Sequence, residues 1–258
     1  GLILGGVLHG EVGTPSQFCA AGATVWTIIF SIPIFLAVPE PAHPATAERI
    51  GFFASYVELV RGVKRLYNET RPTFWFLLAS AVYRDGLSAV FTFGSVLAAI
   101  VFGFSFTELV IFGIVLNLVA GVSTIIAGRI DDVVGPKAVI LVSVGGLIVC
   151  CLVVFFGADL GTPLFWAAGV VLALFVGPAQ AASRSFLARV TPAGREGEVF
   201  GLYATTGRAA GWMASLLWGV FIALSGDQTL WGILGIVVVL AVGFAMLLFV
   251  KPPARVAR

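Results

Sequence analysis

The run Ala138-Val-Ile-Leu-Val-Ser-Val-Gly-Gly-Leu-Ile-Val-Cys-Cys-Leu-Val-Val-Phe-Phe156 decides the fold class of this chain. It contains no charged residue, and it has about the 20 residues that a helix needs to cross the hydrocarbon layer of a bilayer. Its residues do not alternate between apolar and polar, as the strands of a membrane barrel do. The run is therefore typical of a transmembrane helix.

Six further apolar runs of similar length flank this one. They cover residues 18–38, 73–103, 109–128, 163–183, 200–224 and 230–250. Each is long enough to span a bilayer as a helix. A chain of 258 residues has room for six or seven such spans and their loops. We therefore expect an all-α membrane protein, a polytopic bundle of transmembrane helices.

The composition excludes the other broad classes of protein. Hydrophobic residues make up 59% of the chain and charged residues only 11%, whereas soluble domains carry roughly 25% charged residues. The high apolar content and the net charge of only +2 exclude a disordered chain. Three cysteines in so long a chain exclude a disulfide scaffold. The lipid bilayer is the expected partner.

Lys and Arg residues gather in alternate loops. The loops 39–72, 129–137 and 184–199 and the tail 251–258 hold thirteen of the 15 basic residues. The opposite loops carry acidic residues instead: Glu11, Glu108, Asp159 and Asp227. The positive-inside rule puts the basic side, and with it the C-terminus, in the cytoplasm. We expect a multi-pass protein of the plasma (inner) membrane of a prokaryote. Topology explains these cations, so no nucleic-acid partner is expected.

The long loop 39–72 contains a second helical pattern. Between residues 48 and 70, apolar side chains recur every three or four positions, at Phe53, Val57, Val60, Val63 and Tyr67. Arg61, Lys64 and Arg65 interleave with them, which predicts an amphipathic helix with a basic face. We expect a connector that lies at the inner leaflet; the alternative is a regulatory lipid sensor.

Two basic residues and one acidic residue lie inside spans. Arg84 and Asp85 are adjacent in the run 73–103, and Arg208 lies in the run 200–224. Both sites are about 15–18 Å from the cytoplasmic ends of their helices. An intramembrane charge costs on the order of 2.5–3.5 kcal/mol, so such residues are usually paired and functional. We expect an Asp85–Arg208 pair that leaves Arg84 for an anionic group of a substrate. Alternatively, Asp85 takes up a proton when the pair opens, or the pair is permanent and structural.

The short loop 128–137 follows the pattern G-x-x-x-D-x-x-G-x-K. Two helices reverse direction here, and its glycines supply permissive backbone. Its second aspartate precedes the next helix and is placed to cap it. A charge cluster of Asp132, Arg184 and Glu198 at the cytoplasmic rim would hold one conformation shut; the alternative is a hairpin stabilised by its own cap. The candidate gate residues are Gly128, Asp132, Gly135, Lys137, Arg184 and Glu198.

The sequence gives little support to an enzyme or a pump. The chain has two histidines, His9 and His43, and no H-E-x-x-H motif. An aspartyl pair inside the membrane would need a second aspartate beside Asp85. There is no glycine-rich phosphate loop of the kind that ATP-driven pumps use. We expect no catalytic residue, no metal and no cofactor.

Several motifs carry a resemblance to a known family. The loop 128–137 resembles the signature loop of the major facilitator superfamily. More specifically, Gly177-Pro-Ala-Gln-Ala-Ala-Ser-Arg-Ser-Phe, Pro192-Ala-Gly-Arg-Glu-Gly-Glu-Val-Phe-Gly-Leu-Tyr203 and Gly207-Arg-Ala resemble the autophagy-linked vacuolar amino-acid effluxers and their bacterial relatives. Tyr83-Arg-Asp-Gly-Leu87 resembles that family's Tyr-Asn-Asp-Gly-Leu stretch, with Arg84 in place of a neutral amide. The resemblance covers about residues 73–250.

The resemblance implies an organisation for the whole chain. Residues 1–38 would be the end of one helix and one full helix of a preceding half, and residues 39–72 a cytoplasmic linker between halves. Residues 73–250 would form the six-helix C-terminal bundle of a twelve-helix transporter, followed by the cytoplasmic tail 251–258. The N-terminal half becomes an expected partner. The helices that line the substrate path in this superfamily here carry Asp85, Asn117, Gln180 and Arg208.

The leading hypothesis is a secondary active transporter that moves a small solute by alternating access. Midplane charges, small-residue ridges and a rim cluster favour it, and the resemblance implies an amino acid and efflux. The substrate or proton pathway is predicted to contain Arg84, Asp85, Asn117, Gln180 and Arg208. The alternative is an incomplete or non-transporting half that acts as a fragment, scaffold or dimerising module, because the chain opens at Gly1 within an apolar run.

Overall fold

The computed structural model describes residues 14–37, 52–192 and 194–250, which fall into two units, Gly1–Gly51 and Phe52–Arg258. In the first unit the described element is α2, Thr14–Ala37, which has Pro33 inside it and exposed apolar side chains such as Trp26 and Phe35. It corresponds to the predicted run 18–38. The expected end of an earlier helix before it and the tail 251–258 lie outside the described residues.

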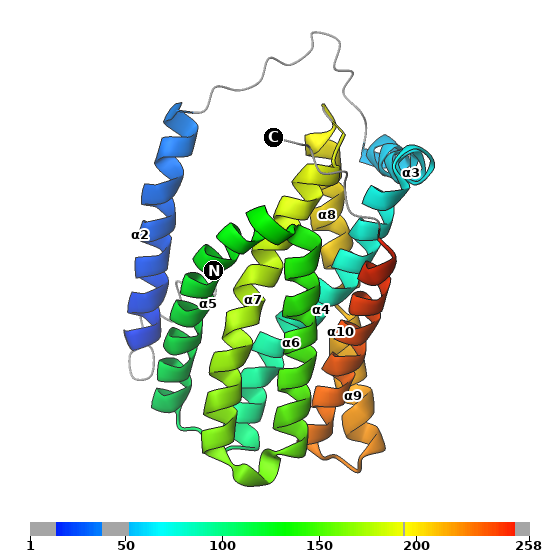
Figure 1. Ribbon diagram of the computed structural model, residues 1–258. Coiled ribbons are helices and arrows are strands. Elements are labelled where there is room, and N and C mark those ends of the chain that lie inside the picture. Colours follow the sequence, from blue (N-terminus) through cyan, green and yellow to red (C-terminus); the bar gives the residue numbers. More distant parts are fainter. Residues whose placement is uncertain (1–13, 38–51, 193, 251–258) are drawn as a thin grey trace. The chain divides into compact units, whose positions relative to one another are not determined.

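The second unit is a bundle of helices (Figure 1). Its elements are α3 (Phe52–Glu69), α4 (Arg71–Ile100), α5 (Phe106–Val134), α6 (Pro136–Phe156), η1 (Ala158–Leu160), α7 (Thr162–Val190), α8 (Glu196–Ala210), α9 (Met213–Leu224), η2 (Thr229–Trp231) and α10 (Gly232–Phe249). With α8 and α9 counted as one span, the described residues contain seven helices long and apolar enough to cross a membrane. The prediction of an all-α polytopic membrane protein is confirmed.

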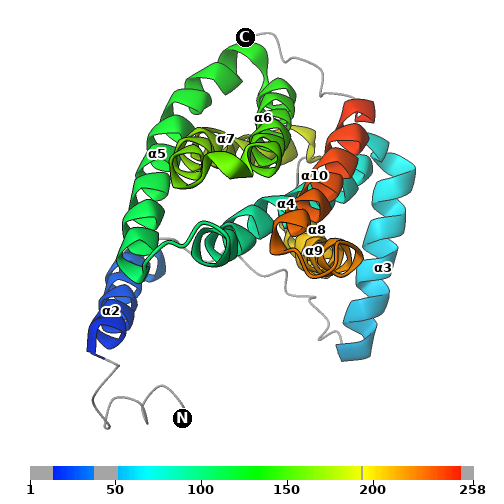
Figure 2. The same cartoon turned by 90° about the horizontal axis from the view of Figure 1, so that it is seen from below.

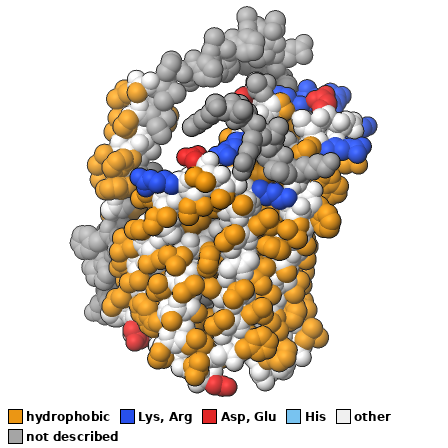
Figure 3. Space-filling view, viewed as in Figure 1, with side chains coloured by type: hydrophobic (Ala, Val, Ile, Leu, Met, Phe, Trp, Pro, Cys, Tyr) orange, Lys and Arg blue, Asp and Glu red, His pale blue; other side chains and the backbone are white. Residues whose placement is uncertain are grey.

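The bundle helices form two groups of neighbours, as the view along them shows (Figure 2). Helix α7 packs between α5 and α6, while α10 packs against α4 and α9. Contacts of α6 with α10 and of α4 with α7 join the two groups. Apolar side chains cover the sides of the bundle, and Lys and Arg side chains gather at one end of it (Figure 3). This distribution is the one that a bilayer demands.

Glycines set how closely α10 approaches its neighbours. A Cβ added at Gly235 would lie 2.6 Å from the backbone carbon of Leu217 in α9. One added at Gly243 would lie 2.7 Å from the backbone nitrogen of Tyr83 in α4. Small residues allow such backbone contact between helices in lipid, where packing rather than the hydrophobic effect drives association. Helix α10 is therefore held against both α4 and α9 along its length.

Helix α3 lies beside the bundle near one end and roughly perpendicular to the bundle helices, since it is seen end-on where they stand upright and lengthwise where they are seen end-on (Figures 1 and 2). Its buried side, with Gly62 and Leu66, faces the bundle, while Arg61, Lys64 and Arg65 are exposed. The predicted helix is therefore present as α3, and its side chains at residues 61–69 form a buried and a basic side, although Tyr67, which was expected on the apolar side, is exposed. Residues 48–51, and the side chains of the expected apolar positions Phe53, Val57 and Val60, lie outside the described part.

The reversal between α5 and α6 is tighter than predicted. Helix α5 continues through Gly128 as far as Val134, and α6 begins at Pro136. Gly135 alone makes the turn, with φ of +91°, a conformation that L side chains rarely adopt. The expectation that Gly128 serves this turn is therefore wrong, because the helix does not end until the residue before Gly135.

The predicted run 200–224 is also not one helix. Helix α8 ends at Ala210 and α9 begins at Met213. Between them the Gly211 N–H donates to the Arg208 carbonyl at 3.2 Å and the Trp212 N–H to the Ala210 carbonyl at 2.8 Å. These short-range bonds replace the i to i−4 pattern, so the helix is interrupted in the middle of the span.

Candidate functional site

Four consecutive residues of α4, Tyr83 to Gly86, contact the neighbouring helices α7, α8, α9 and α10. The Tyr83 hydroxyl is hydrogen-bonded to the Ser183 hydroxyl of α7 at 2.7 Å, and both residues are fully buried. A Cβ at Gly86 would lie 2.7 Å from Leu240 Cδ2 of α10. Between these anchors lie Arg84 and Asp85, which face α8 and α9. This segment, residues 83–86, is called the α4 hub below.

Arg84 binds α8 through neutral partners. Its Nη1 donates to the Tyr203 carbonyl at 3.1 Å, and its Cζ lies 4.0 Å from the centroid of the Tyr203 ring. The guanidinium also lies against Gly207, where an added Cβ would be 2.8 Å from Nη1. A carbonyl and an aromatic face stabilise a cation without neutralising it. Arg84, in the middle of a 30-residue helix, therefore has no carboxylate partner among the described residues.

Asp85 does not form the expected pair with Arg208. Its Oδ2 instead accepts a hydrogen bond from the backbone N–H of Ala214 at 2.7 Å, and the residue is buried. Ala214 is the second residue of α9, so its N–H has no acceptor within that helix. The positive end of α9 attracts the carboxylate. The sequence could not predict this contact because the helix start lies inside an apolar run.

Arg208, Asn117 and Gln180 are exposed in this structure. Arg208 lies in the last turn of α8, and among the described residues no carboxylate forms an ion pair with it. The Asn117 side chain donates to the Gly113 carbonyl of its own helix at 2.8 Å. The predicted pathway residues are thus not joined by direct contacts: Asp85 is buried, and the other four are half-buried or exposed.

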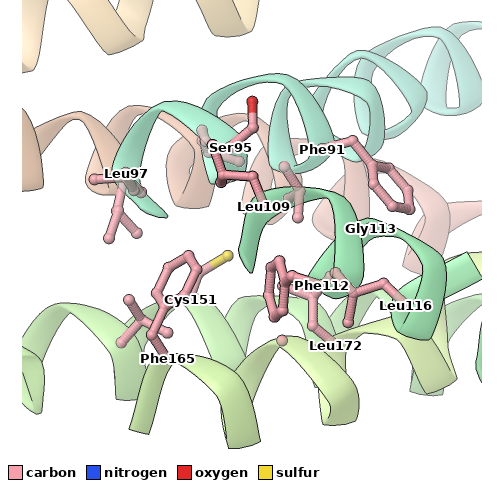
Figure 4. Close-up of a pocket in the computed structure, with 16 residues that line it drawn as sticks. Phe91, Ser95, Leu97, Leu109, Phe112, Gly113, Leu116, Cys151, Phe165 and Leu172 are labelled. Atoms are coloured by element: carbon pink, nitrogen blue, oxygen red, sulfur yellow. The ribbon is translucent and has the colours of Figure 1, made fainter. Parts of the chain in front are cut away.

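An apolar cavity of about 160 Å³ lies further along α4, between α4, α5, α6, α7 and α10 (Figure 4). Apart from the Ser95 hydroxyl and the Cys151 thiol, its side chains are apolar, and Phe91, Phe112 and Phe165 supply rings. Phe91 and Ser95 are themselves exposed, so the cavity reaches the surface beside them. Arg84, Ser88, Phe91 and Ser95 are three or four residues apart and therefore share one face of α4.

The rim has a different composition from the predicted cluster. Buried Asp131, rather than Asp132, joins α5 to α7: its Oδ2 accepts from Ser185 Oγ at 2.6 Å and from Arg189 Nη2 at 3.4 Å. Asp132 lies 3.7 Å from Arg189, but 75% of its side chain is exposed. Because α5 continues to Val134, Asp132 sits within that helix and does not cap α6. Gly135 holds the cap position of α6.

Glu198 belongs to a separate network that ties α3 to α8. It accepts from Arg195 Nε at 2.9 Å and from Arg65 Nη2 at 3.3 Å, and Arg195 also pairs with Glu69 at 2.9 Å. The hydrogen bond to Glu198 raises the pKa of Arg195 above its ordinary value. Gly62 permits the approach, since a Cβ there would lie 2.8 Å from Glu198 Oε1. The expected cluster is therefore not formed, since Asp132 and Glu198 belong to separate networks.

Arg184 and Lys137 lie outside both networks. Arg184 is exposed, and it has no ion pair with the described residues. Lys137 Nζ donates to the carbonyls of Leu248 and Val250 at 2.9 and 2.6 Å. A cation at these carbonyls complements the negative end of α10. Lys137 thus fastens the end of α10 to the start of α6.

Sequence reasoning named neither Asp131 nor Ala214. Asp131 continues the buried stripe of α5 formed by Leu116, Ser123 and Ala127, and that spacing was a usable signal. Nothing in the side chain of Ala214 marks it, because it acts through its backbone. Within the described residues, no three His, Cys, Asp or Glu side chains come together as metal ligands.

The family described as "Vacuole effluxer Atg22 like" matches residues 11–254. The chain belongs to this family. It is 27% identical over 241 residues to a protein of Bacillus subtilis (strain 168) named "Uncharacterized MFS-type transporter YxiO", a match that covers 93% of this chain and 55% of that protein. The family resemblance seen in the motifs is therefore confirmed.

A second group of Atg22-like relatives is fungal. "Autophagy-related protein 22" of Cryptococcus neoformans var. neoformans serotype D (strain JEC21) is 24% identical over 241 residues, covering 86% of this chain and 42% of that protein. The same protein of strain B-3501A is also 24% identical, with 44% of its length covered. This chain thus spans about half the length of the curated relatives it matches.

Proposed function

We propose that the full-length protein is a secondary active transporter that moves a small solute with an anionic group, an amino acid, in the efflux direction. The observation that carries this proposal is the charge of Arg84 and Arg208. Both lie in the middle of their spans, and no described carboxylate neutralises either one. The carboxylate of Asp85, the one described acid at that depth, instead accepts the backbone N–H of Ala214.

Uncompensated guanidinium groups at this depth need a polar environment. Facing lipid, each would cost on the order of 2.5–3.5 kcal/mol, so the face that carries them is expected to line an aqueous path or to be covered by protein. A guanidinium presents a planar fork of donors that matches a carboxylate. These cations therefore suit a substrate with a carboxylate group.

The apolar cavity supplies a second element of recognition. It follows Arg84 and Ser88 along the same face of α4 and has a volume of about 160 Å³. An apolar protein cavity of about 150 Å³ holds one benzene molecule. We infer a substrate whose apolar group has the size of one ring or a branched aliphatic side chain. An amino acid with such a side chain carries one group of each kind.

The topology proposal follows from the same bundle. Apart from Arg84 and Arg208, the Lys and Arg residues of the bundle gather at one end of it, which we place in the cytoplasm together with the C-terminus. The membrane is proposed to be the plasma membrane of a prokaryote, which the Bacillus relative supports. We propose that the part of the full-length protein corresponding to the N-terminal half of the superfamily covers the face that carries Arg84 and Arg208.

Efflux from proteoliposomes tests the function. The purified full-length protein is reconstituted with radiolabelled amino acids inside, and release is measured over time. The account predicts release of amino acids with apolar side chains, and at least tenfold slower release by Arg208→Gln. Arg129→Gln, an exposed cation at the end of α5, is the matched control and should keep wild-type release. No release of any amino acid by the wild type would favour the non-transporting alternative.

A further inference from the structure

The break between α8 and α9 has a charged side chain at each of its two ends. Arg208 is in the last turn of α8, where a cation complements the carbonyl end of the helix. The Asp85 carboxylate sits at the first turn of α9, where an anion complements the N–H end. Each helix end inside the span is thus matched by a charge of the favourable sign.

The contact at the α9 end comes from another helix. Ala214 and Asp85 are both buried, and the 2.7 Å bond joins them across 129 residues of chain. In a continuous helix the Ala214 N–H would donate to the Ala210 carbonyl. The Asp85 oxygen takes the place of that carbonyl. The interrupted form therefore has an acceptor that a straight helix would not need.

Asp85 is mounted on a fixed support. On one side of it, Tyr83 is hydrogen-bonded to Ser183 and its backbone contacts Gly243. On the other side, Gly86 packs directly against Leu240. The α4 hub therefore cannot shift relative to α7 and α10 without breaking these contacts, and the position of the Asp85 oxygen is determined by them.

We propose that Asp85 is a positioning residue: by accepting the Ala214 N–H it holds the α8–α9 break in place and thereby aims Arg208 at the substrate path. Asp85 is buried, so it acts through the backbone of α9 and not on substrate. A helix that ran straight through residues 210–213 would turn the final residues of α8 to new directions. The proposal deepens the transport function and rests on it only for the role given to Arg208.

Two substitutions remove the bond from opposite sides. Asp85→Ala removes the acceptor. Ala214→Pro removes the donor, and proline is tolerated in the first turn of a helix because its N–H is not needed there. Asp85→Asn keeps an acceptor oxygen and is the conservative rescue. Because Ala214→Pro also forbids a straight helix through residue 210, the double variant Asp85→Ala/Ala214→Pro should regain the interrupted form that Asp85→Ala alone loses.

The geometry of the break is measured by spin-label distances in the full-length protein. Labels go on Phe200→Cys and Leu224→Cys, exposed positions in α8 and α9, with the native cysteines replaced by alanine. A straight helix would separate these Cα atoms by about 36 Å, and the break shortens the distance. Asp85→Ala should lengthen or broaden the distribution, because the freed Ala214 N–H can then donate to the Ala210 carbonyl of a straight helix. Ala214→Pro should keep a short distance, because its ring clashes with the Ala210 carbonyl in a straight helix, and Asp85→Asn should keep most of the wild-type population.

Transport by the same variants gives the second measurement. Asp85→Ala should raise KM at least fivefold with less effect on kcat, and Asp85→Asn should recover at least half of that loss. A wild-type distance in Asp85→Ala would overturn the proposal, as would Asp85→Asn matching Asp85→Ala in distance and KM. Because the distances need no substrate, a wild type that fails to transport would refute the proposed function and leave this test intact.

Discussion

The guanidinium of Arg84 lies over the ring of Tyr203, 4.0 Å from its centroid, and donates to the carbonyl of the same residue at 3.1 Å. Both partners are neutral, so the contact fixes the direction of the cation and leaves its charge available. A stacked and hydrogen-bonded guanidinium cannot be replaced by an ammonium without loss of geometry. This relationship is the basis of the predictions about substrate.

Gly207→Ala is expected to displace Arg84 without changing any charge. The new Cβ would lie 2.8 Å from Nη1 and 3.2 Å from Cζ, so the flexible guanidinium must leave Tyr203. A lost hydrogen bond to a charged group is worth about 1.5–3 kcal/mol, which corresponds to a rise in KM of roughly tenfold to a hundredfold if substrate binding uses this position. Steady-state transport in proteoliposomes measures it.

Gly201→Ala is the matched control on the same helix. An added Cβ at Gly201 meets nothing within 4 Å. Alanine at this position should leave KM unchanged and stabilise α8 by roughly 0.5–1 kcal/mol. Equal KM values for Gly207→Ala, Gly201→Ala and the wild type would show that the position of the Arg84 guanidinium has no part in substrate binding.

Asp131→Asn should destabilise the protein more than Asp132→Asn does. Asp131 is buried and pairs with Ser185 and Arg189 across α5 and α7, whereas the Asp132 side chain is 75% exposed. We expect a loss of about 1–3 kcal/mol for Asp131→Asn, since the buried carboxylate that accepts from Ser185 and Arg189 is replaced by an amide with one acceptor oxygen and no charge, and roughly 0–0.5 kcal/mol for Asp132→Asn. Thermal unfolding of the purified full-length protein in detergent compares them; the opposite order would refute the assignment of Asp131 to the rim contact.

Labelling from outside the cell tests the proposed orientation. In a cysteine-free full-length protein, Asp159→Cys should react with a membrane-impermeant maleimide on intact cells. Glu196→Cys should react only after the membrane is opened. Both positions are exposed, at opposite ends of the bundle, so access by itself does not distinguish them. The reverse pattern would place the basic end, and the C-terminus, outside.

Hydropathy predicted nearly all of the helical architecture, because a run such as 138–156 has no alternative in a bilayer. It did not predict the break at Gly211, since Ala210, Gly211 and Trp212 are apolar and resemble the rest of their span. The partner of Asp85 depends on that break and was therefore out of reach. At the rim, two adjacent aspartates differ only in the helix face they occupy, and only the packing of α5 on α7 distinguishes them. The depth of Arg84, Asp85 and Arg208 was predictable, while their contacts were not.

The most direct test of the central claim compares an amino acid with its amide. The full-length protein in proteoliposomes is given leucine or leucinamide, which differ in the carboxylate that Arg84 and Arg208 are proposed to bind. The account predicts at least tenfold higher kcat/KM for leucine, a preference that Arg84→Gln and Arg208→Gln each reduce severalfold. Equal transport of the acid and the amide by the wild type, or an unchanged preference in both variants, would contradict it.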